Sequence, residues 1–180
     1  MHYLIGVVVL QGASEEQVHD ALSPYDENVE VAEHDAVCHC RIMSSFEKRG
    51  ELTEGLTGDD AQAALWERRA SLARLAPDPT CEHCNGTGTQ RSTYNERSLF
   101  DYYEIGGRWS GVWGERNRIA VAELLDQELS LPYALVLPEG LVSARAEFYV
   151  EKPAAVWVAE ARSALAPYRD RDVFAVDCHK

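Results

Sequence analysis

Two cysteines three residues apart, Cys81 and Cys84, are the residues of this chain whose type and spacing most directly indicate chemistry. At this spacing one tight turn can direct both sulfur atoms at a tetrahedral metal ion. Gly86 and Gly88 follow, and glycine permits the positive backbone angles with which amide groups turn back toward metal-bound sulfur. The segment therefore predicts a zinc knuckle in which these two thiolates bind one zinc ion.

Two further ligands must come from elsewhere in the chain. Cys38 and Cys40 are the best donors, because they would complete a closed, structural four-cysteine site, and His39 and His83 are substitutes. In an alternative interpretation only one of Cys38 and Cys40 faces the knuckle, and Cys178 is a small core residue. A site with three protein ligands and a water could be catalytic, but the sequence identifies no general base beside it.

The eight residues from Cys81 to Gly88 resemble the Cys-x-x-Cys-x-Gly-x-Gly unit of the DnaJ-type chaperones. In that family two such units supply one zinc ion, whereas this chain has one unit and no J-domain signature. The resemblance therefore implies zinc and does not support a chaperone role.

Aromatic, hydroxyl, amide and charged side chains gather after the knuckle, up to residue 109. Arg108, beside a Gly-Gly pair, can present a planar cation, and Tyr103 or Trp109 offers a stacking face. This pattern suggests a recognition surface for a protein or a small anionic, nucleotide-like ligand, with Tyr94, Asn95, Tyr103, Arg108 and Trp109 as its residues. We favour the structural alternative, in which Arg108 pairs with an acid and the aromatic residues belong to a hairpin core.

Asp177 and His179 stand two residues apart at the end of an expected strand, so their side chains share one face. With Arg108 holding phosphate, the pair could transfer protons in a hydrolase or phosphodiesterase that acts on a nucleotide-like substrate. A lone histidine so near the chain end is more often a solvated group. The enzyme hypothesis requires these three residues to converge in one pocket, and whether the chain is an enzyme stays open.

The stretch from the knuckle through Trp109, together with Val176-Asp177-Cys178-His179, resembles uncharacterised proteins of actinobacteria and their phages. This resemblance implies no reaction and suggests only a mobile element or its host as the source. It gives a third hypothesis, in which an acidic protein mimics nucleic acid and blocks a host DNA-binding protein. That hypothesis requires carboxylates spaced along one exposed face.

Composition excludes several classes of protein. The formal charge of -13 disfavours nucleic acid as a partner, because the basic residues form no dense patch. No apolar run approaches the length that crosses a bilayer, and no secretory signal opens the chain, so we expect a soluble, cytoplasmic protein. Five cysteines, an odd count in such a chain, disfavour a disulfide framework and favour metal binding. The oligomeric state cannot be derived from these features.

The elements that position these residues follow from apolar periodicity and turn residues. Strands are expected at 3–10, within 29–43, and at 133–137, 141–150 and 172–177. A short helix is expected to start at Ser14, where Gln17 completes a capping box. Further helices are expected over 59–76, 119–129 and 153–166. A hairpin is expected where 99–105 and 109–113 flank Gly106-Gly107-Arg108.

These elements predict an α+β fold with a mostly antiparallel sheet and helices on one face, for which the ferredoxin-like arrangement is one candidate topology. The strand at 3–10 should lie centrally, in one sheet with the last strand. At 180 residues and 46% hydrophobic, the chain is long enough for a single domain over 1–180, with the zinc knuckle as a loop over 77–98.

Overall fold

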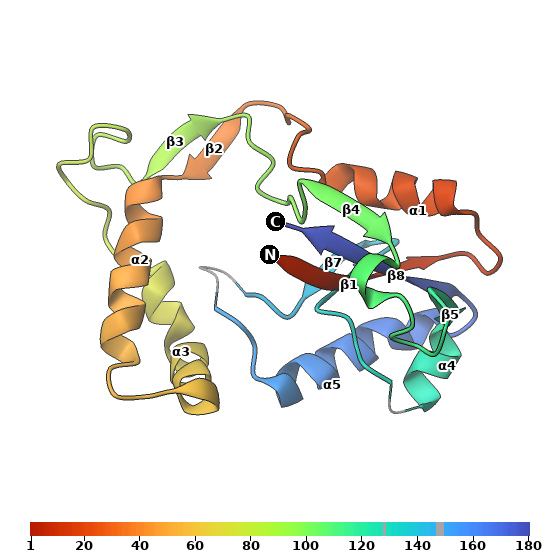
Figure 1. Cartoon of the computed structure of the whole chain (residues 1–180). Coiled ribbons are helices and arrows are strands. Elements are labelled where there is room, and N and C mark those ends of the chain that lie inside the picture. Colours follow the sequence, from red (N-terminus) through yellow and green to blue (C-terminus); the bar gives the residue numbers. More distant parts are fainter. Residues whose placement is uncertain (128, 147–149) are drawn as a thin grey trace. The chain divides into compact units, whose positions relative to one another are not determined.

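The chain is an α+β protein with two compact units, and its computed structural model describes residues 1–127, 129–146 and 150–180 (Figure 1). Unit 1 consists of Met1–Glu30, Asn95–Ala144 and Ala155–Lys180. Unit 2 consists of Val31–Tyr94 and Arg145–Ala154. The single domain expected over 1–180 stays a prediction.

Unit 1 is built on a sheet whose strands run in the order β4-β8-β1-β6-β7, while β5 pairs with another part of β8. The strands are β1 (His2–Val9), β4 (Tyr102–Ile105), β5 (Arg118–Ala120), β6 (Ala134–Leu137), β7 (Gly140–Ser143) and β8 (Asp172–His179). Only the β1–β6 pair is parallel among these described strands, and the other pairs are antiparallel. The mostly antiparallel sheet and the central place of β1 beside the last strand are confirmed.

Helices cover both faces of this sheet because β1 is apolar along nearly its whole length and needs cover on each side. Ile5 and Val7 pack in one cluster with Val18 and Leu22 of α1 (Glu15–Leu22). Their neighbours Leu4 and Val8 pack in the opposite cluster with α4 (Val121–Asp126) and α5 (Ala154–Leu165). The expected placement of helices on one face therefore holds for α4 and α5, and α1 is an addition on the other face.

The predicted start of α1 is confirmed in detail. Ser14 is the N-cap, and its backbone N–H donates to the side-chain Oε1 of Gln17 at 3.1 Å. This contact satisfies a donor that the helix itself leaves unpaired. It also fixes where the chain turns from β1 into the helix.

The predicted hairpin around Gly106-Gly107 is wrong in its second strand. β4 pairs with β8, and Gly107–Trp109 form a 3-10 turn instead of leading into a returning strand. Gly106 and Gly107 have φ angles of 77° and 47°, which let the chain turn sharply after β4. The edge of β8 offers β4 a long partner, and this tertiary pairing replaces the local one.

Other boundaries differ from the sequence expectation. The segment 29–43 holds only the short strand β2 (His34–Val37), and α2 (His39–Leu52) begins within it. The helix expected over 119–129 starts with β5 and continues as α4, while residue 128 lies outside the described residues. Of the strand expected over 141–150, β7 accounts for the start, and 147–149 lie outside the described residues.

Unit 2 contains little buried apolar surface. It joins the two-stranded sheet of β2 and β3 (Thr89–Ser92) to α2 and α3 (Gly58–Ala73), the helix predicted over 59–76. Its buried hydrophobic residues, among those described, are Ala36, Cys38, Leu72, Cys84 and Val150. A unit of this size with so small a core needs another source of stability. None of the described helices of the chain is long and apolar enough to span a membrane.

Candidate metal centre

Four cysteines of unit 2 meet at one point. The Sγ atoms of Cys38, Cys40, Cys81 and Cys84 all lie within 4.8 Å of one another. Cys38 and Cys81 are 3.8 Å apart, and Cys40 and Cys84 are 3.7 Å apart. Zinc–sulfur bonds of about 2.3 Å in a tetrahedron place neighbouring sulfurs about 3.8 Å apart, whereas a disulfide bond is about 2.05 Å long. The group is therefore close enough to hold a metal ion.

The start of α2 supplies two of the four sulfurs. Cys38 ends the extended segment as the N-cap of α2, and Cys40 lies in the first helical turn. This change from extended to helical backbone directs both side chains to the same place, so both of them face the knuckle. The positive end of the helix dipole also favours negative charge on thiolates there.

The knuckle supplies the other two sulfurs, and backbone hydrogen bonds hold it in shape. Cys81 N–H donates to the carbonyl of Asp78 at 3.2 Å, and Thr87 N–H donates to the carbonyl of Cys84 at 3.0 Å. Cys38 N–H donates to the carbonyl of Gly88 at 2.9 Å, which ties the end of β2 to the knuckle. These bonds bring the two cysteine pairs together.

The glycines of the knuckle have the positive backbone angles that the motif predicted. Gly86 has a φ of 77° and Gly88 a φ of 80°. A Cβ atom on Gly88 would lie 2.8 Å from the side chain of Arg41 and 3.0 Å from that of Pro77. Both the angle and the close packing therefore require glycine at position 88.

The thiols influence one another's ionisation. Burial raises the pKa of Cys84, but the backbone N–H of Gly88 and the three other thiols lower it more, and the resulting pKa is about 7. For Cys38, the backbone hydrogen bond from Cys40 lowers the pKa, while burial and the other thiols raise it to about 12. One thiolate thus forms readily and makes the next one costly, because like charges repel. A cation among the sulfurs would remove this conflict.

The substitute ligands named from the sequence do not join the group. His39 and His83 are both exposed, and neither belongs to the metal-binding group found among the described residues. Cys178 belongs to unit 1, where it is fully buried in the cluster beneath α1. Burial raises the pKa of this thiol to about 12, so it stays neutral.

The residues of the predicted recognition surface are divided between the two units. Tyr94 belongs to unit 2 and is exposed, whereas the others belong to unit 1. Asn95 is buried, and its amide Nδ2 donates to the backbone carbonyls of Pro24 at 2.9 Å and Asp26 at 3.0 Å. These bonds give Asn95 a structural role in joining two loops.

Tyr103 and Trp109 pack on opposite faces of the sheet. Tyr103 contacts the cluster of α1, with its ring centroid 4.8 Å from that of Phe100, whereas Trp109 packs against the cluster of α5. The Arg108 side chain is exposed, and no ion pair of it is found among the described residues. The predicted pairing of Arg108 with an acid is therefore not seen.

Asp177 and His179 lie on one face of β8 but in separate histidine–carboxylate pairs. Asp177 is buried, and its Oδ1 lies 2.9 Å from Nδ1 of His2, while its Oδ2 accepts the backbone N–H of Arg108 at 3.1 Å. Nδ1 of His179 lies 2.8 Å from Oδ1 of Asp101, and this hydrogen bond lowers the pKa of Asp101. His2 was missed from the sequence, since only the pairing of β1 with β8 brings it here.

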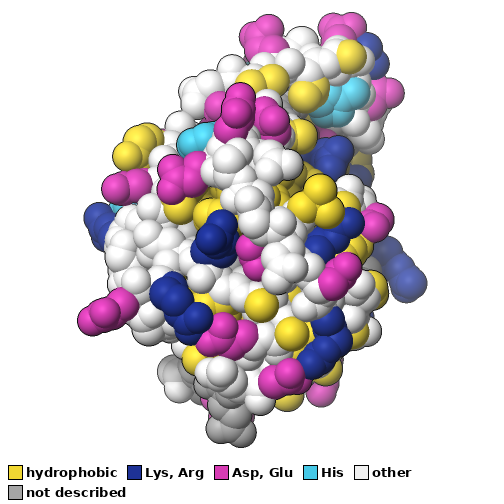
Figure 2. Space-filling view, turned by 90° about the vertical axis from the view of Figure 1, so that its right-hand side faces the viewer, with side chains coloured by type: hydrophobic (Ala, Val, Ile, Leu, Met, Phe, Trp, Pro, Cys, Tyr) yellow, Lys and Arg dark blue, Asp and Glu magenta, His cyan; other side chains and the backbone are white. Residues whose placement is uncertain are grey.

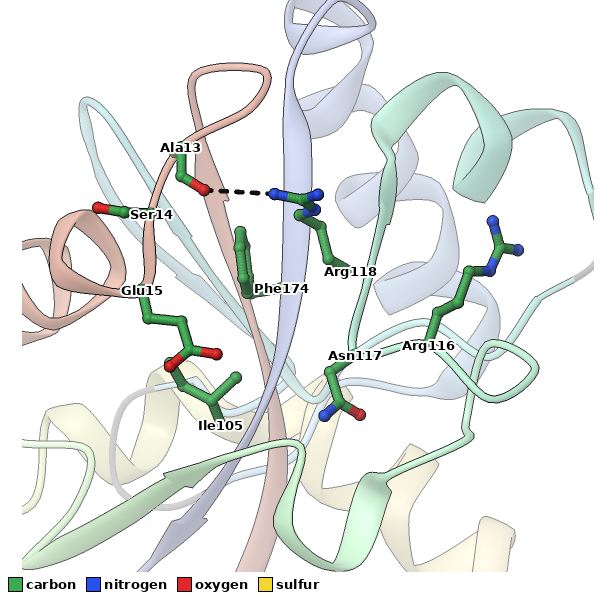
Figure 3. A pocket seen from close by; sticks show the side chains of 8 residues that line it. All are labelled: Ala13, Ser14, Glu15, Ile105, Arg116, Asn117, Arg118 and Phe174. Atoms are coloured by element: carbon green, nitrogen blue, oxygen red, sulfur yellow. Dashed lines mark hydrogen bonds between the residues drawn. The ribbon is translucent and has the colours of Figure 1, made fainter.

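A cavity of about 540 Å³ lies in unit 1, where β4 ends and β5 begins along β8 (Figure 3). It is lined by Ala13, Ser14, Glu15, Ile105, Arg116, Asn117, Arg118 and Phe174. Arg118 donates to the carbonyl of Ala13 at 3.3 Å and lies 3.8 Å from Asp172, and Arg116 pairs with Glu123 at 2.5 Å. Both cations are thus neutralised by the protein itself, and none of the three predicted catalytic residues lines the cavity.

The metal centre rests on its own geometry. In comparisons with protein-family models, with curated proteins and with solved structures, nothing matches this chain. The likeness of residues 81–88 to the DnaJ-type unit therefore rests on the sequence motif alone. The four-cysteine group itself is established by the distances between its sulfur atoms.

Proposed function

We propose that Cys38, Cys40, Cys81 and Cys84 bind one zinc ion, and that the protein is a small zinc-stabilised binding or regulatory protein. The observation that carries this proposal is the close grouping of the four sulfurs, two pairs of which have the edge length of a zinc–thiolate tetrahedron. Four thiolates in a tetrahedron are typical of zinc or of iron. The Cys-x-x-Cys knuckle with its glycines favours zinc.

The zinc ion is structural in this proposal. Four protein ligands leave no position for a water or a substrate, so the closed site offers no Lewis-acid chemistry. Its role is to join the start of α2 to the knuckle, 43 residues away along the chain. The small buried core of unit 2 supports this role, because metal binding then supplies folding free energy that apolar burial does not.

The partner in this proposal is a protein or a small anionic ligand that contacts exposed residues of the segment from Tyr94 to Trp109. Tyr94 in unit 2 and Arg108 in unit 1 are both exposed, so each is accessible to such a partner. The contacts of Asn95, Tyr103 and Trp109 account for those residues without a ligand. The free state of the five cysteines fits a reducing compartment, so we propose the cytoplasm, and the likeness to phage proteins keeps a mobile element as the proposed source.

The two other functions have less support. For a hydrolase or phosphodiesterase, Asp177 and His179 bond different partners and do not form a proton-transfer pair with each other. For a nucleic-acid mimic, the face in Figure 2 carries acidic side chains interspersed with Lys and Arg, and no continuous acidic surface. We therefore retain the zinc-stabilised binding protein as the conclusion.

The proposal is tested by metal analysis joined to hydrogen exchange. Tag-free protein prepared without chelator should contain about one zinc per chain. Removal of the metal should abolish amide protection in α2, α3 and β3, while β1 and β8 keep theirs, because their protection comes from an apolar core. Metal-free protein with unchanged protection in unit 2 would contradict the structural role.

A further inference from the structure

We propose a second metal site, in unit 1, where His2 and His179 together bind one divalent transition-metal ion through their Nε2 atoms. The two residues are directly opposite each other in the antiparallel pair of β1 and β8. These two inner strands of the sheet place the start of the chain beside its end, where β1 begins and β8 ends (Figure 1). This site is separate from the cysteine group and does not depend on it.

The first argument is the spacing of the two rings. Opposite residues of an antiparallel pair hold their Cβ atoms about 5 Å apart. The imidazole centroids of His2 and His179 lie 4.9 Å apart, with the planes inclined by 62°. Two imidazoles on one ion, each with a metal–nitrogen bond of about 2.0–2.1 Å, have centroids about 5 Å apart at ordinary bond angles. The two ring centroids therefore already have the separation of two imidazoles on one ion.

The second argument is the orientation of each ring. Nδ1 of His2 lies 2.9 Å from Asp177, and Nδ1 of His179 lies 2.8 Å from Asp101. A neutral histidine that donates its Nδ1–H to a carboxylate has its lone pair on Nε2, which is the form that binds a metal. Protein metal sites commonly hold their histidines by such carboxylates. Here both ligands have one.

The third argument is the local charge. Besides Asp177 and Asp101, a third carboxylate lies nearby. It belongs to Glu104, which is exposed and directly opposite Asp177 in the pair of β4 and β8. Opposite residues point to the same face of a sheet, so a third carboxylate lies on the face of the two histidines. Carboxylates on this face favour a bound cation.

The ligand class follows from these donors. Imidazole nitrogen suits zinc, nickel and copper, and does not suit magnesium or calcium, which prefer oxygen. Two protein ligands leave the other coordination positions to water, so the ion is exchangeable and binds more weakly than zinc at four thiolates. Partial exposure of both side chains, 25% for His2 and 42% for His179, gives the ion a path from solvent.

The test is titration calorimetry with Ni²⁺ on tag-free protein that already holds one equivalent of zinc. We expect one Ni²⁺ per chain, and at least about tenfold weaker binding in His2→Ala and in His179→Ala. His34→Ala, which removes a histidine of unit 2, is the matched control and should bind like the parent. Asp101→Asn keeps an acceptor for His179 but removes its charge, and should weaken binding with no loss of fold.

The melting temperature and zinc content of each variant establish that it is folded. Binding that survives in His179→Ala but is lost in His2→Ala would indicate chelation by the amino terminus and His2, and would overturn the proposal. Parent protein that binds Ni²⁺ no more tightly than a variant carrying both His2→Ala and His179→Ala would overturn it as well. Loss of Ni²⁺ binding with retained zinc would also show that the two sites are independent.

Discussion

The Sγ atoms of Cys38 and Cys81, 43 residues apart in sequence, lie 3.8 Å from each other, at the separation of two thiolates on one zinc ion. The same is true of Cys40 and Cys84, at 3.7 Å. Cys38 and Cys40 come from the start of helix α2. Cys81 and Cys84 come from a glycine-containing turn. Each element brings two sulfurs to the other, and a metal ion bound there would close a long segment of chain.

Replacement of a proposed zinc ligand should destabilise unit 2 and leave unit 1 folded. Cys84→Ser should lose zinc and make residues 31–94 sensitive to protease, because unit 2 has so little apolar core. Fragments from limited proteolysis, identified by mass, check this. Cys178→Ala is the control, since it also removes a buried sulfur but lies in unit 1. Equal zinc content in both variants would show that Cys84 is no ligand.

The reactivity of the thiols should show whether zinc is bound to the four cysteines. In native protein with zinc, no cysteine should react quickly, because the proposed site makes four of them ligands and Cys178 is buried with a raised pKa of about 12. A chelator should expose about four thiols, and a denaturant the fifth. Counting with a chromophoric disulfide reagent gives the result. Fast reaction of several cysteines in the presence of zinc would contradict the assignment.

Acid should release the metal. Without metal, Cys84 has a pKa of about 7 and Cys38 one of about 12, so much of the group is protonated at neutral pH. Zinc binding must displace these protons, and its affinity therefore falls as the pH falls. Because the zinc-bound state holds fewer protons than the unfolded chain, the stability of unit 2 should rise with pH between about 5 and 8. Melting curves of the zinc form across this range test the sign, and a flat profile would contradict it.

Two glycine substitutions should have opposite effects. Gly107 has a φ of 47°, and a Cβ there would lie 2.5 Å from the Cβ of Asp177, so Gly107→Ala should destabilise unit 1 by about 1–3 kcal/mol. Gly50 lies within α2 with no neighbour within 4 Å of an added Cβ, so Gly50→Ala should stabilise unit 2 by about 0.5–1 kcal/mol. Denaturant unfolding measures both. A neutral Gly107→Ala would mean that the turn after β4 can relax away from Asp177.

Local patterns in the sequence predicted the parts of the structure that local physics determines. The knuckle at Cys81 and Cys84, the capping box at Ser14 and the apolar strand β1 depend on neighbours in sequence, and local spacing or composition predicted each of them. Cys38 and Cys40 were found by a different argument, because few other donors could complete a thiolate site. Their place at the start of α2 was not expected.

Long-range pairing accounts for what the sequence could not predict. β4 was expected to pair with the segment after Gly107, but β8 offered it a longer partner. His2 carried no signal of its own, since its contact with Asp177 exists only once β1 and β8 are in register. Tyr103 and Trp109, six residues apart, were assigned to one surface but pack on opposite faces of the sheet.

The central claim is that four sulfur atoms bind one zinc ion, and X-ray absorption at the zinc edge tests it most directly. Protein that holds a single equivalent of zinc should show a first shell of about four sulfurs at about 2.3 Å and no nitrogen or oxygen ligand. The same measurement on Cys40→Ser should show a lost or oxygen-containing shell. A shell of two sulfurs with nitrogen or oxygen in the parent protein would contradict the claim, because Cys38 and Cys40 could not then both be ligands.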